Sequence, residues 1–473
     1  MSPIGVDEWV AQHTDRQDAG TGWRRWMYTL EARMGWWPRL AIVLVAGLIF
    51  GSLSLNSNIE QVAINCLIYA ILAVGLNIAV GWAGLLDLGY VAFFGFGAYG
   101  YAIFSSDALG TDGSAGVHLS SLVSIPMVFV AAAIFGAVIG LVSLRVSGDY
   151  LAIVTLFVGQ AFVEVANNVD TGTLGGVNGL FGLDPIHAFG HQITTPKGYL
   201  YFAIVVLAVL MGLLHFLDGS RTGRGWRAVR EDELAAEAMT VPTKVVKVMS
   251  ISFGAAVGAL AGTIFAAQQS NVFPTNFTAN ILILIYACLV LGGVGSIAGA
   301  ALGGIVVTAG EQMVSSPTDA AYLFYGLILL GLVMKVRPWR VLGLVLASTA
   351  VLGVALHAIV GAISPAATGG TPGSGGWIGD LVKHWVIVPT NATTYGNILY
   401  VATIALVFAV VNVRPRWRPY LLVPTIYVAA CCWESRLIVN PSITAQILIG
   451  AILIATMSAR PQGLLGTLRV EVV

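Results

Sequence analysis

Charged side chains are scarce in this chain. Only 10% of its 473 residues are Asp, Glu, Lys or Arg, and 57% are hydrophobic, whereas an ordinary soluble domain carries about 25% charged residues. The 23 basic and 23 acidic residues cancel, so no excess of one sign indicates a nucleic acid or an acidic substrate as a partner. The composition therefore excludes water as the main solvent of the fold and indicates a protein of the lipid bilayer.

Cysteine is also scarce, and its few copies are not arranged for chemistry. They are Cys66, Cys288, Cys431 and Cys432. All four lie in apolar runs, at spacings typical of neither metal sites nor disulfide frameworks. We expect them to be small core residues, and we expect the chain to bind no metal and no cofactor of its own.

Long apolar runs follow one another along almost the whole chain. A hydrocarbon core of about 30 Å requires about 20 apolar residues in a helix that rises about 1.5 Å per residue. Candidate spans lie near 38–55, 59–80, 84–104, 119–145, 149–166, 198–218, 247–269, 278–293, 297–313, 319–335, 340–362, 395–413, 419–433 and 443–459. The sequence thus predicts an all-α polytopic membrane protein with about fourteen transmembrane helices.

The loops between these spans carry charge on alternate sides. Lys and Arg favour the cytoplasmic side, and if residues 1–37 form a cytoplasmic tail, every second loop should be basic. The basic residues of those loops are Arg145, Arg221, Arg224, Arg227, Arg230, Lys244, Lys335, Arg337, Arg340, Arg414, Arg416, Arg418, Arg460 and Arg469. The opposite loops, 105–118, 167–197, 270–277 and 314–318, carry only Lys197. Both termini are therefore predicted to be cytoplasmic, and residues 1–37 do not resemble a signal peptide.

Glycine interrupts the third predicted span. Glycine weakens a helix by about 1 kcal/mol relative to alanine, so its density in residues 75–104 requires a reason. One reason is close helix packing through small residues; the other is a broken helix that lines a pathway. Asp87 favours the second, because a charge in the middle of a membrane is costly, unless it lies near an interface. The candidate pathway residues are Gly81, Gly84, Asp87, Gly89, Gly95, Gly97 and Tyr99.

The most strongly charged loop, residues 223–247, has the signals of a short helix. Asp232 is a candidate N-cap, Glu231 and Glu233 favour the positive end of a helix dipole, and Pro242 stops its continuation. Small residues follow the cap, including Ala235 and Ala236, which allow a second protein to approach closely. The loop is either a solvated connection or a docking surface.

Several segments resemble the permease subunit of branched-chain amino acid ABC importers, the LivM type. These segments are GLNIAVGWAGLLDLGYVAFFGFGAY (75–99), SGDYLAIVTL (147–156), GGVNGL (175–180), GRGWRAVREDELAAEAM (223–239) and LVLGGVGSIAGAALGG (289–304). They occur in the family's order across residues 60–340.

The resemblance implies a transport subunit, without enzymatic activity of its own, in the cytoplasmic (inner) membrane of a bacterium. It implies a homologous second permease, two cytoplasmic ABC ATPases that use ATP, and an external substrate-binding protein. This chain lacks the phosphate-binding pattern GxxxxGK[ST]. In the family the charged loop forms the coupling helix that sits in a cleft of the ATPase. By this match the coupling residues are Arg224, Arg227, Arg230, Glu231, Asp232, Ala235 and Ala236.

The chain departs from the family in three places. Thr240 and Pro242 follow the coupling helix where relatives more often have glycine and then a residue other than proline, and Gln160 stands where an acid is expected. The chain is also longer, because the ending that relatives show near 322–343 recurs at 445–466.

We expect a permease core of about ten helices at 38–340 and an added bundle of about four helices at 341–473. The bundle contains a flexible external loop at 365–394. It serves either as peripheral packing or as a binding surface for the partner permease, a lipid or an accessory protein. The motif WESR (433–436) is expected to be an interfacial anchor.

Three functions remain open from the sequence. The first is an importer permease for branched-chain or other hydrophobic amino acids, with urea or short amides as the substrates of close relatives. The second is an ion-coupled secondary transporter, which requires paired ionisable groups within the spans, where Asp87 and Glu164 are the main candidates. The third is a membrane enzyme, which requires clustered His, Asp or Glu at one interface, and the sequence contains no such cluster.

Overall fold

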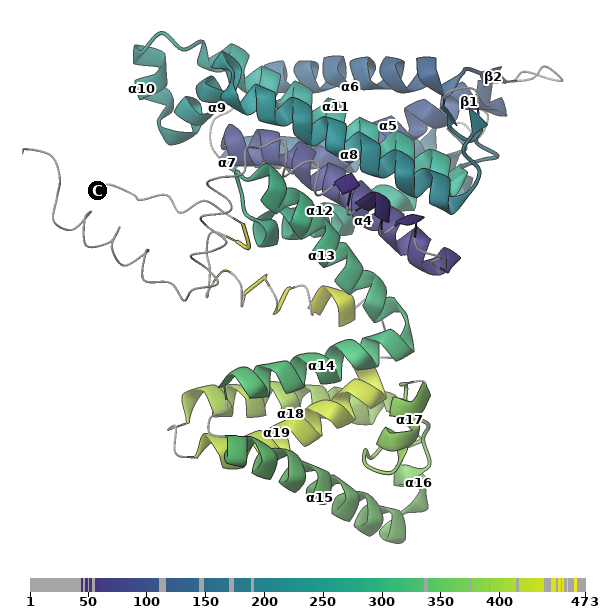
Figure 1. The fold of residues 1–473 in the computed structure, drawn as a ribbon, viewed down its shortest axis with the longest axis vertical. Coiled ribbons are helices and arrows are strands. Elements are labelled where there is room, and N and C mark those ends of the chain that lie inside the picture. The colour runs from purple at the N-terminus through teal and green to yellow at the C-terminus, as the bar shows by residue number, and fades with distance from the viewer. Residues whose placement is uncertain are drawn as a thin grey trace, which may run out of the picture. The chain divides into compact units, whose positions relative to one another are not determined.

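The computed structural model is built almost entirely of helices (Figure 1). It describes residues 44–45, 47–49, 51–52, 56–109, 116–143, 149–169, 174–188, 191–335, 339–374, 376–390, 392–413, 417–437, 444–447, 450–451, 453–454, 457 and 463–465. The chain divides into two compact units. Unit 1 comprises Met1–Ile71 with Trp82–Asn276, and unit 2 comprises Leu72–Gly81 with Phe277–Val473.

Unit 1 is a bundle of long apolar helices with short strands in its loops. Its helices are most of α4 (Ser57–Leu76), α5 (Tyr90–Phe104), α6 (Ser121–Ser143), α7 (Asp149–Asn168), α8 (Pro196–Gly219), α9 (Arg221–Glu231), α10 (Glu233–Ala238) and α11 (Thr243–Gln269). Three antiparallel strand pairs join β1 (Ser105–Ser106) to β2 (Val117–His118), β3 (Leu180–Phe181) to β6 (Asn271–Val272), and β4 (His187–Ala188) to β5 (His191–Gln192). A π-helix, η1 (Asn77–Trp82), follows α4 and ends where unit 1 resumes.

Helix α5 is the central helix of unit 1. It packs along α11, α6 and α7, and eleven of its fifteen residues are buried. A helix that is apolar on all sides is shielded from water either by other helices or by lipid, and the burial of α5 shows that other helices cover it. The glycine-rich span predicted from the sequence is therefore in the interior of the bundle.

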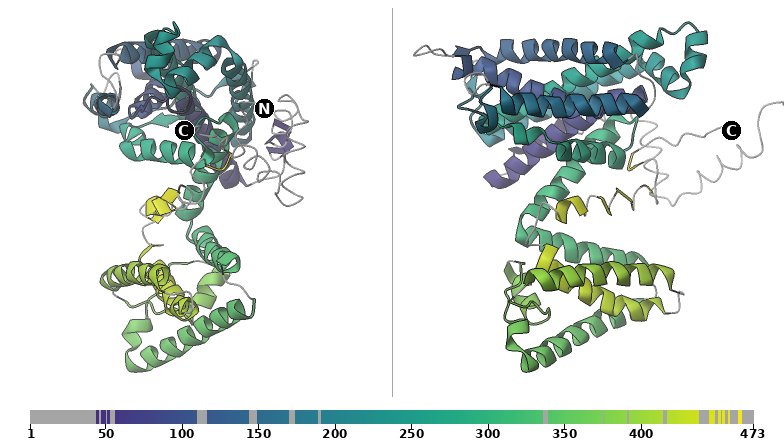
Figure 2. Two further views of the ribbon diagram at one scale, coloured as in Figure 1. Left: turned by 90° about the vertical axis from the view of Figure 1, so that its left-hand side faces the viewer. Right: turned by 180° about the vertical axis from the view of Figure 1, so that it is seen from behind.

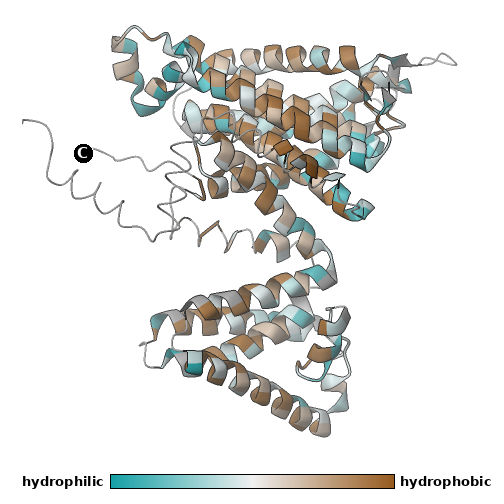
Figure 3. Cartoon of the chain, in the orientation of Figure 1, coloured by the Kyte–Doolittle hydropathy of each residue, from teal (hydrophilic) through white to brown (hydrophobic). Residues whose placement is uncertain are grey.

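The two ends of unit 1 carry different loops. Helices α9 and α10 lie at one end of the bundle, and β1 and β2 lie at the other (Figure 1). Polar residues gather on α9 and α10, while the long helices are mainly apolar (Figure 3). The loops predicted to face opposite sides of the membrane thus lie at opposite ends of unit 1.

Unit 2 contains the remaining helices. They are α12 (Ala279–Gly292), α13 (Ile297–Ser315), α14 (Pro317–Lys335), α15 (Trp339–Ile363), α16 (Pro365–Thr368), α17 (Gly376–Lys383), α18 (Ala392–Asn412), α19 (Arg418–Cys432) and the π-helix η5 (Trp433–Leu437). Figure 2 shows α14 to α19 from two further directions. Helices α16 and α17 occupy part of the predicted flexible loop at 365–394, and Ile378 and Val382 of α17 are buried in a core cluster with Tyr427 of α19.

A buried polar cluster contradicts the prediction of an interfacial WESR motif. Trp433 is fully buried and stacks on Phe324 with ring centroids 4.2 Å apart. Glu434 is 1% exposed; it accepts hydrogen bonds from the Tyr325 hydroxyl at 3.0 Å and from both the backbone N–H and the hydroxyl of Ser374, at 2.9 and 2.5 Å. Stacking favours burial of the Trp433 ring, and the three hydrogen bonds satisfy the buried Glu434 carboxylate.

The predicted spans match the observed helices where the structure describes them. Within the described residues, eight helices are long and apolar enough to cross a membrane, and three shorter apolar helices lie at Tyr90–Phe104, Asp319–Val333 and Thr394–Val410. Most of the predicted spans 38–55 and 443–459 lies outside the described residues, so the count of about fourteen stays a prediction. One span needs correction: the helix expected at 84–104 begins only at Tyr90, and residues 83–89 are not helical.

The four cysteines are free and buried, which confirms their predicted role as core residues.

Near the C-terminus, the repeated ending has a defined contact within unit 2. The backbone N–H groups of Leu464 and Leu465 donate to the carbonyls of Leu291 and Gly292 at 2.9 and 3.0 Å. The second copy of the ending therefore packs at the end of α12.

Candidate coupling surface and translocation helix

Helix α10 begins as the sequence predicts. Asp232 is its N-cap, and one carboxylate oxygen accepts hydrogen bonds from the backbone N–H groups of Leu234 and Ala235 at 2.9 and 3.0 Å. The helix ends at Ala238, with Pro242 directly before α11. An N-cap of this kind contributes about 1 kcal/mol, so α10 has a fixed start although it is only six residues long.

Helix α10 presents an apolar and acidic surface. Leu234 and Met239 are 79% and 77% exposed, and Glu231, Asp232 and Ala235 are also exposed. Ala236 is buried on the inner side of the helix. The sequence analysis selected the alanines and charges but missed Leu234 and Met239; two large apolar residues in an otherwise polar loop were the available signal.

Two of the predicted coupling arginines bind the preceding helix instead of pointing freely outward. Arg224 donates to the Gly219 carbonyl at 2.8 Å. Arg227 donates to the Asp218 carbonyl at 2.8 Å and forms an ion pair with the Asp218 carboxylate at 2.9 Å. Cations at a helix C-terminus satisfy its last carbonyls and favour its dipole. Arg224 and Arg227 therefore fasten α9 to the end of α8.

Trp226 anchors α9 in unit 1. Its side chain is fully buried, and its indole Nε1–H donates to the Val246 carbonyl of α11 at 2.8 Å. Its ring stacks on Trp82, with centroids 5.8 Å apart and planes 22° from parallel. A second contact, an ion pair between Glu233 and Lys247 at 2.5 Å, joins α10 to α11.

Residues 83–89, which join η1 to α5, form a non-helical segment beside α9. Gly84 has a φ of +71°, and a Cβ placed there would meet Arg230 Cγ at 2.9 Å. Asp87 is 3% exposed and accepts a hydrogen bond from the Gly89 N–H at 3.0 Å. Because Gly84 contacts the charged loop, this segment lies at the α9 end of unit 1, and Asp87 lies outside the helices.

The glycines of the candidate pathway allow close packing. A Cβ at Gly97 would come within 2.1 Å of the Ala259 carbonyl oxygen, and one at Gly89 within 2.4 Å of that of Thr155. A Cβ at Gly95 would strike the Phe162 ring. In unit 2, a Cβ at Gly81 would strike the side chain of Asn77. The Oδ1 of Asn77 accepts a hydrogen bond from the Gly295 N–H at 2.8 Å. Packing through small residues accounts for these glycines, and a role in lining a pathway stays a prediction.

A cavity of about 360 Å³ lies between α5, α6 and α7. Tyr99, Gly100, Val128 and Phe162 are among its lining residues, and the lining is apolar apart from the tyrosine hydroxyl. A zwitterionic amino acid would find no partners there for its ammonium and carboxylate groups, and leaving a charge unpaired in an apolar site is costly. This cavity therefore fits hydrocarbon and not a whole amino acid.

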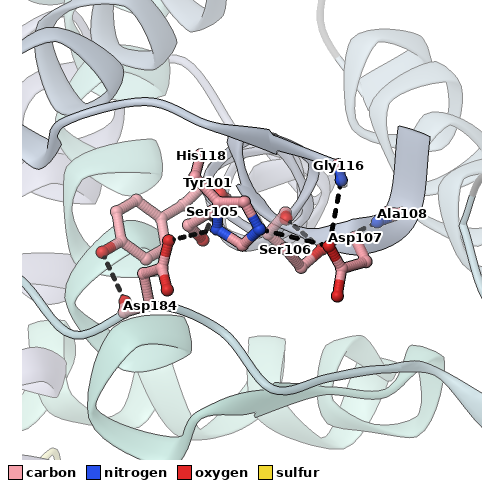
Figure 4. Close-up of polar contacts among 9 residues, drawn as sticks. Tyr101, Ser105, Ser106, Asp107, Ala108, Gly116, His118 and Asp184 are labelled. Carbon is pink, nitrogen blue, oxygen red and sulfur yellow. Dashed lines mark hydrogen bonds and ion pairs between the residues drawn. The ribbon is translucent and has the colours of Figure 1, made fainter. Parts of the chain in front are cut away.

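A histidine bridges two acidic residues at the opposite end of α5 (Figure 4). His118 Nδ1 lies 2.5 Å from Asp184 Oδ2, and its Nε2 lies 3.2 Å from Asp107 Oδ1. Tyr101 of α5 donates to the Asp184 carbonyl at 2.8 Å, and the Asp184 N–H donates to the Ser105 carbonyl at 2.8 Å. Residues 105–107, His118 and the segment around Asp184 are thus tied to the end of α5.

The hydrogen-bond partners in this bridge change the pKa values of His118 and Asp107. Hydrogen bonds to Asp184 and Asp107 raise the pKa of His118. Hydrogen bonds from the Gly116 N–H and from His118 lower the pKa of Asp107. Since both neighbours of the ring are carboxylates, only the imidazolium, which donates from both nitrogens, satisfies both contacts.

The long apolar helices, with polar loops gathered at the two ends of unit 1, define the class of protein: a helical, multi-pass membrane protein. The family described as branched-chain amino acid transport system / permease component matches residues 58–333. The chain belongs to this family.

The chain is similar to several characterised permeases. It is 31% identical over 307 residues to the high-affinity branched-chain amino acid transport system permease protein LivM of Escherichia coli, covering 60% of this chain and 69% of that one. It is 31% identical over 168 residues to LivH of Salmonella typhimurium, covering 35% and 53%. A probable branched-chain amino acid transport permease LivM of Methanocaldococcus jannaschii is 24% identical over 263 residues, covering 50% and 75%. No solved structure matches.

Proposed function

We propose that this chain forms half of the translocation pathway of an ATP-driven importer for branched-chain amino acids and couples to a separate ATPase. The substrate is supported by the names of the relatives, which describe branched-chain amino acid transport. The observation that carries the coupling role is the exposed surface of Glu231, Leu234 and Met239, held at one end of unit 1 by Trp226.

The partners follow from the same proposal. A homologous second permease completes the pathway, two cytoplasmic ATPases bind and use ATP, and an external protein delivers the substrate. The complex lies in the inner membrane of a bacterium, with both termini of this chain in the cytoplasm. Similarity to both LivM and LivH supports a pair of related permeases.

The character of α10 defines the chemistry of the ATPase cleft that it enters. Two exposed apolar side chains, Leu234 near the start of α10 and Met239 at its C-cap, would fill a hydrophobic pocket. Exposed carboxylates at Glu231 and Glu237 belong to the same segment, so we expect the cleft to carry basic residues as well. Apolar anchors inside a charged rim are typical of protein interfaces.

Two variants test this surface. Leu234→Asp places a charge in the proposed pocket, and Glu231→Lys reverses one exposed charge of the segment. Each should reduce the ATPase that co-purifies with the tagged chain by about tenfold, which corresponds to about 1.4 kcal/mol. The matched control is Asp319→Lys, which reverses an exposed carboxylate on α14 in unit 2.

Uptake of labelled leucine into proteoliposomes that contain the purified complex tests the substrate. With the substrate-binding protein supplied outside, uptake should require ATP inside the vesicles, on the side of the ATPases, and should not respond to an ion gradient. Retained ATPase binding and uptake in both variants would contradict the coupling assignment. Uptake driven by an ion gradient alone would contradict the importer itself.

A further inference from the structure

We infer that α9 and residues 82–89 form one mechanical unit that passes a displacement of α10 to the beginning of α5. This inference rests on the proposed function, because it assumes that an ATPase moves α10. It assigns positioning roles to Trp82, Gly84 and Trp226, residues that lie outside the exposed surface of α10.

The first connection is the stack of Trp226 on Trp82. The two rings are 5.8 Å apart and nearly parallel, and the exposed fractions of the side chains are 0% and 3%. Trp226 is in addition held by its hydrogen bond to Val246 and by an edge contact with Phe253 of α11. Tightly packed side chains shift as discrete bodies and do not deform gradually, so movement of α9 displaces Trp82.

The second connection is the contact of Arg230 with Gly84. Arg230 is the penultimate residue of α9, two positions before the cap of α10. Its Cγ would lie 2.9 Å from a Cβ at residue 84, closer than such atoms normally approach, and Gly84 has a left-handed φ of +71°. Both the backbone conformation and the close approach require glycine at this position.

The connection continues from Gly84 to two long helices. The Leu88 N–H donates to Thr155 Oγ1 of α7 at 2.9 Å. Asp87 holds the Gly89 N–H, and α5 begins at the next residue, Tyr90. Helix α5 is in turn enclosed by α6, α7 and α11, so a shift of its first turn reaches the core of unit 1.

The break in the helix suits this role. A continuous helix from α4 to α5 would resist bending through its backbone hydrogen bonds, whereas a few non-helical residues absorb changes in φ and ψ, as hinge residues do. Residues 83–89 are such a segment, and the π-helix η1 directly precedes it.

The central test is Gly84→Ala in the complete complex, purified through a tag on this chain and reconstituted in vesicles. The added methyl group separates Arg230 from the segment and strains the backbone. The matched control is Gly219→Ala at the end of α8, where a Cβ meets open space. Three quantities are measured: the ATPase that co-purifies, ATP hydrolysis, and leucine uptake per ATP hydrolysed.

We expect Gly84→Ala to lower uptake per ATP about fivefold or more, the range of an ordinary coupling free energy, while ATPase binding and hydrolysis stay close to those of the control. Unchanged uptake per ATP would overturn the inference and leave the proposed function intact. Loss of ATPase binding in parallel with uptake would also overturn it. Failure of the unmodified complex to bind an ATPase would instead refute the proposed function.

A double-mutant cycle gives a second test that retains aromatic side chains and thus the fold. Trp82→Phe and Trp226→Phe are made singly and together, with Trp377→Phe, an exposed tryptophan of unit 2, as the control. If the stack transmits movement, the effects of the two substitutions on uptake per ATP are not additive, because either one interrupts the same connection. Additive effects would overturn the inference.

Discussion

The His118 ring lies between two carboxylates at the end of α5 opposite the coupling surface (Figure 4). Its two partners come from different parts of the chain, because Asp107 is 11 positions away and Asp184 is 66 positions away. The sequence analysis therefore had no local pattern by which to select it. Its chemistry is nevertheless specific, because a neutral imidazole donates from one nitrogen only.

The first prediction concerns the pH dependence of this bridge. The folded protein raises the pKa of His118 above the ordinary histidine value of 6.5. The protonated ring therefore contributes fully to the stability of the fold below pH 6.5, and this contribution is lost as the pH rises through the raised pKa. The folded protein lowers the pKa of Asp107 below the ordinary aspartate value of 3.8. The ionised carboxylate therefore contributes to the stability of the fold above pH 3.8, and this contribution is lost as the pH falls through the lowered pKa. The bridge should thus be strongest at weakly acidic pH.

Hydrogen exchange of the backbone amides in 116–119 and 183–186 measures this effect. After correction for intrinsic exchange, protection should be greater at about pH 5.5 than at about pH 8.5, on either side of the usual histidine range. In His118→Ala the difference should disappear, and His215→Ala, a change in α8, serves as the control. Equal protection at both pH values in the unmodified chain would show that the bridge does not titrate as described.

At the scale of elements, the exit from α10 shows how a departure from the family pattern is accommodated. Thr240, which the sequence analysis identified as a departure from an expected glycine, has a φ of 65°. A β-branched residue is strained in this left-handed region, at a cost of about 1–2 kcal/mol. The helix therefore ends with the backbone turn that glycine would make, and the chain retains the geometry at the expense of strain.

The second prediction is that Thr240→Gly stabilises unit 1. Relief of the strain is partly offset by the greater flexibility of glycine in the unfolded chain, so a net gain of about 0.5–1 kcal/mol is expected. Thermal unfolding of the detergent-solubilised chain measures it. Thr240→Ala is the matched control, because it keeps the Cβ and with it the strain; an equal gain from both substitutions would refute the explanation.

Helix positions were largely predictable from the sequence, whereas the interruptions between helices were not. Runs of apolar residues located α6, α8, α11 and α15 within a few residues. The same signal placed the third span at 84–104, although α5 begins at Tyr90. Apolar composition reports burial in a membrane or a core, but it does not distinguish a helix from an extended segment that is equally buried.

At the scale of the whole molecule, the repeated C-terminal ending has a structural partner within unit 2. Gly463 has a φ of +80°, and a Cβ there would come within 2.6 Å of the Gly293 backbone. Together with the hydrogen bonds from Leu464 and Leu465 to the end of α12, this contact places the second copy of the motif against α12.

The third prediction follows from this contact. Deletion of residues 463–473 removes two backbone hydrogen bonds, each worth about 0.5–1.5 kcal/mol, and should lower the midpoint of thermal unfolding. Deletion of residues 467–473 keeps the contact and is the control. If the two deletions lower the midpoint equally, the contact of Gly463–Leu465 does not stabilise unit 2.

The sequence by itself determined the class of protein, the approximate helices, the Asp232 cap and the family, because each depends on composition, local spacing or a motif. The tertiary structure decided which residues meet across long separations: Arg227 with Asp218 at a helix end, Trp226 with Trp82, and Glu434 with Tyr325 and Ser374. In an apolar chain nearly every position is compatible with burial. Only the packing of helices therefore decides which tryptophan, glycine or carboxylate acquires a partner.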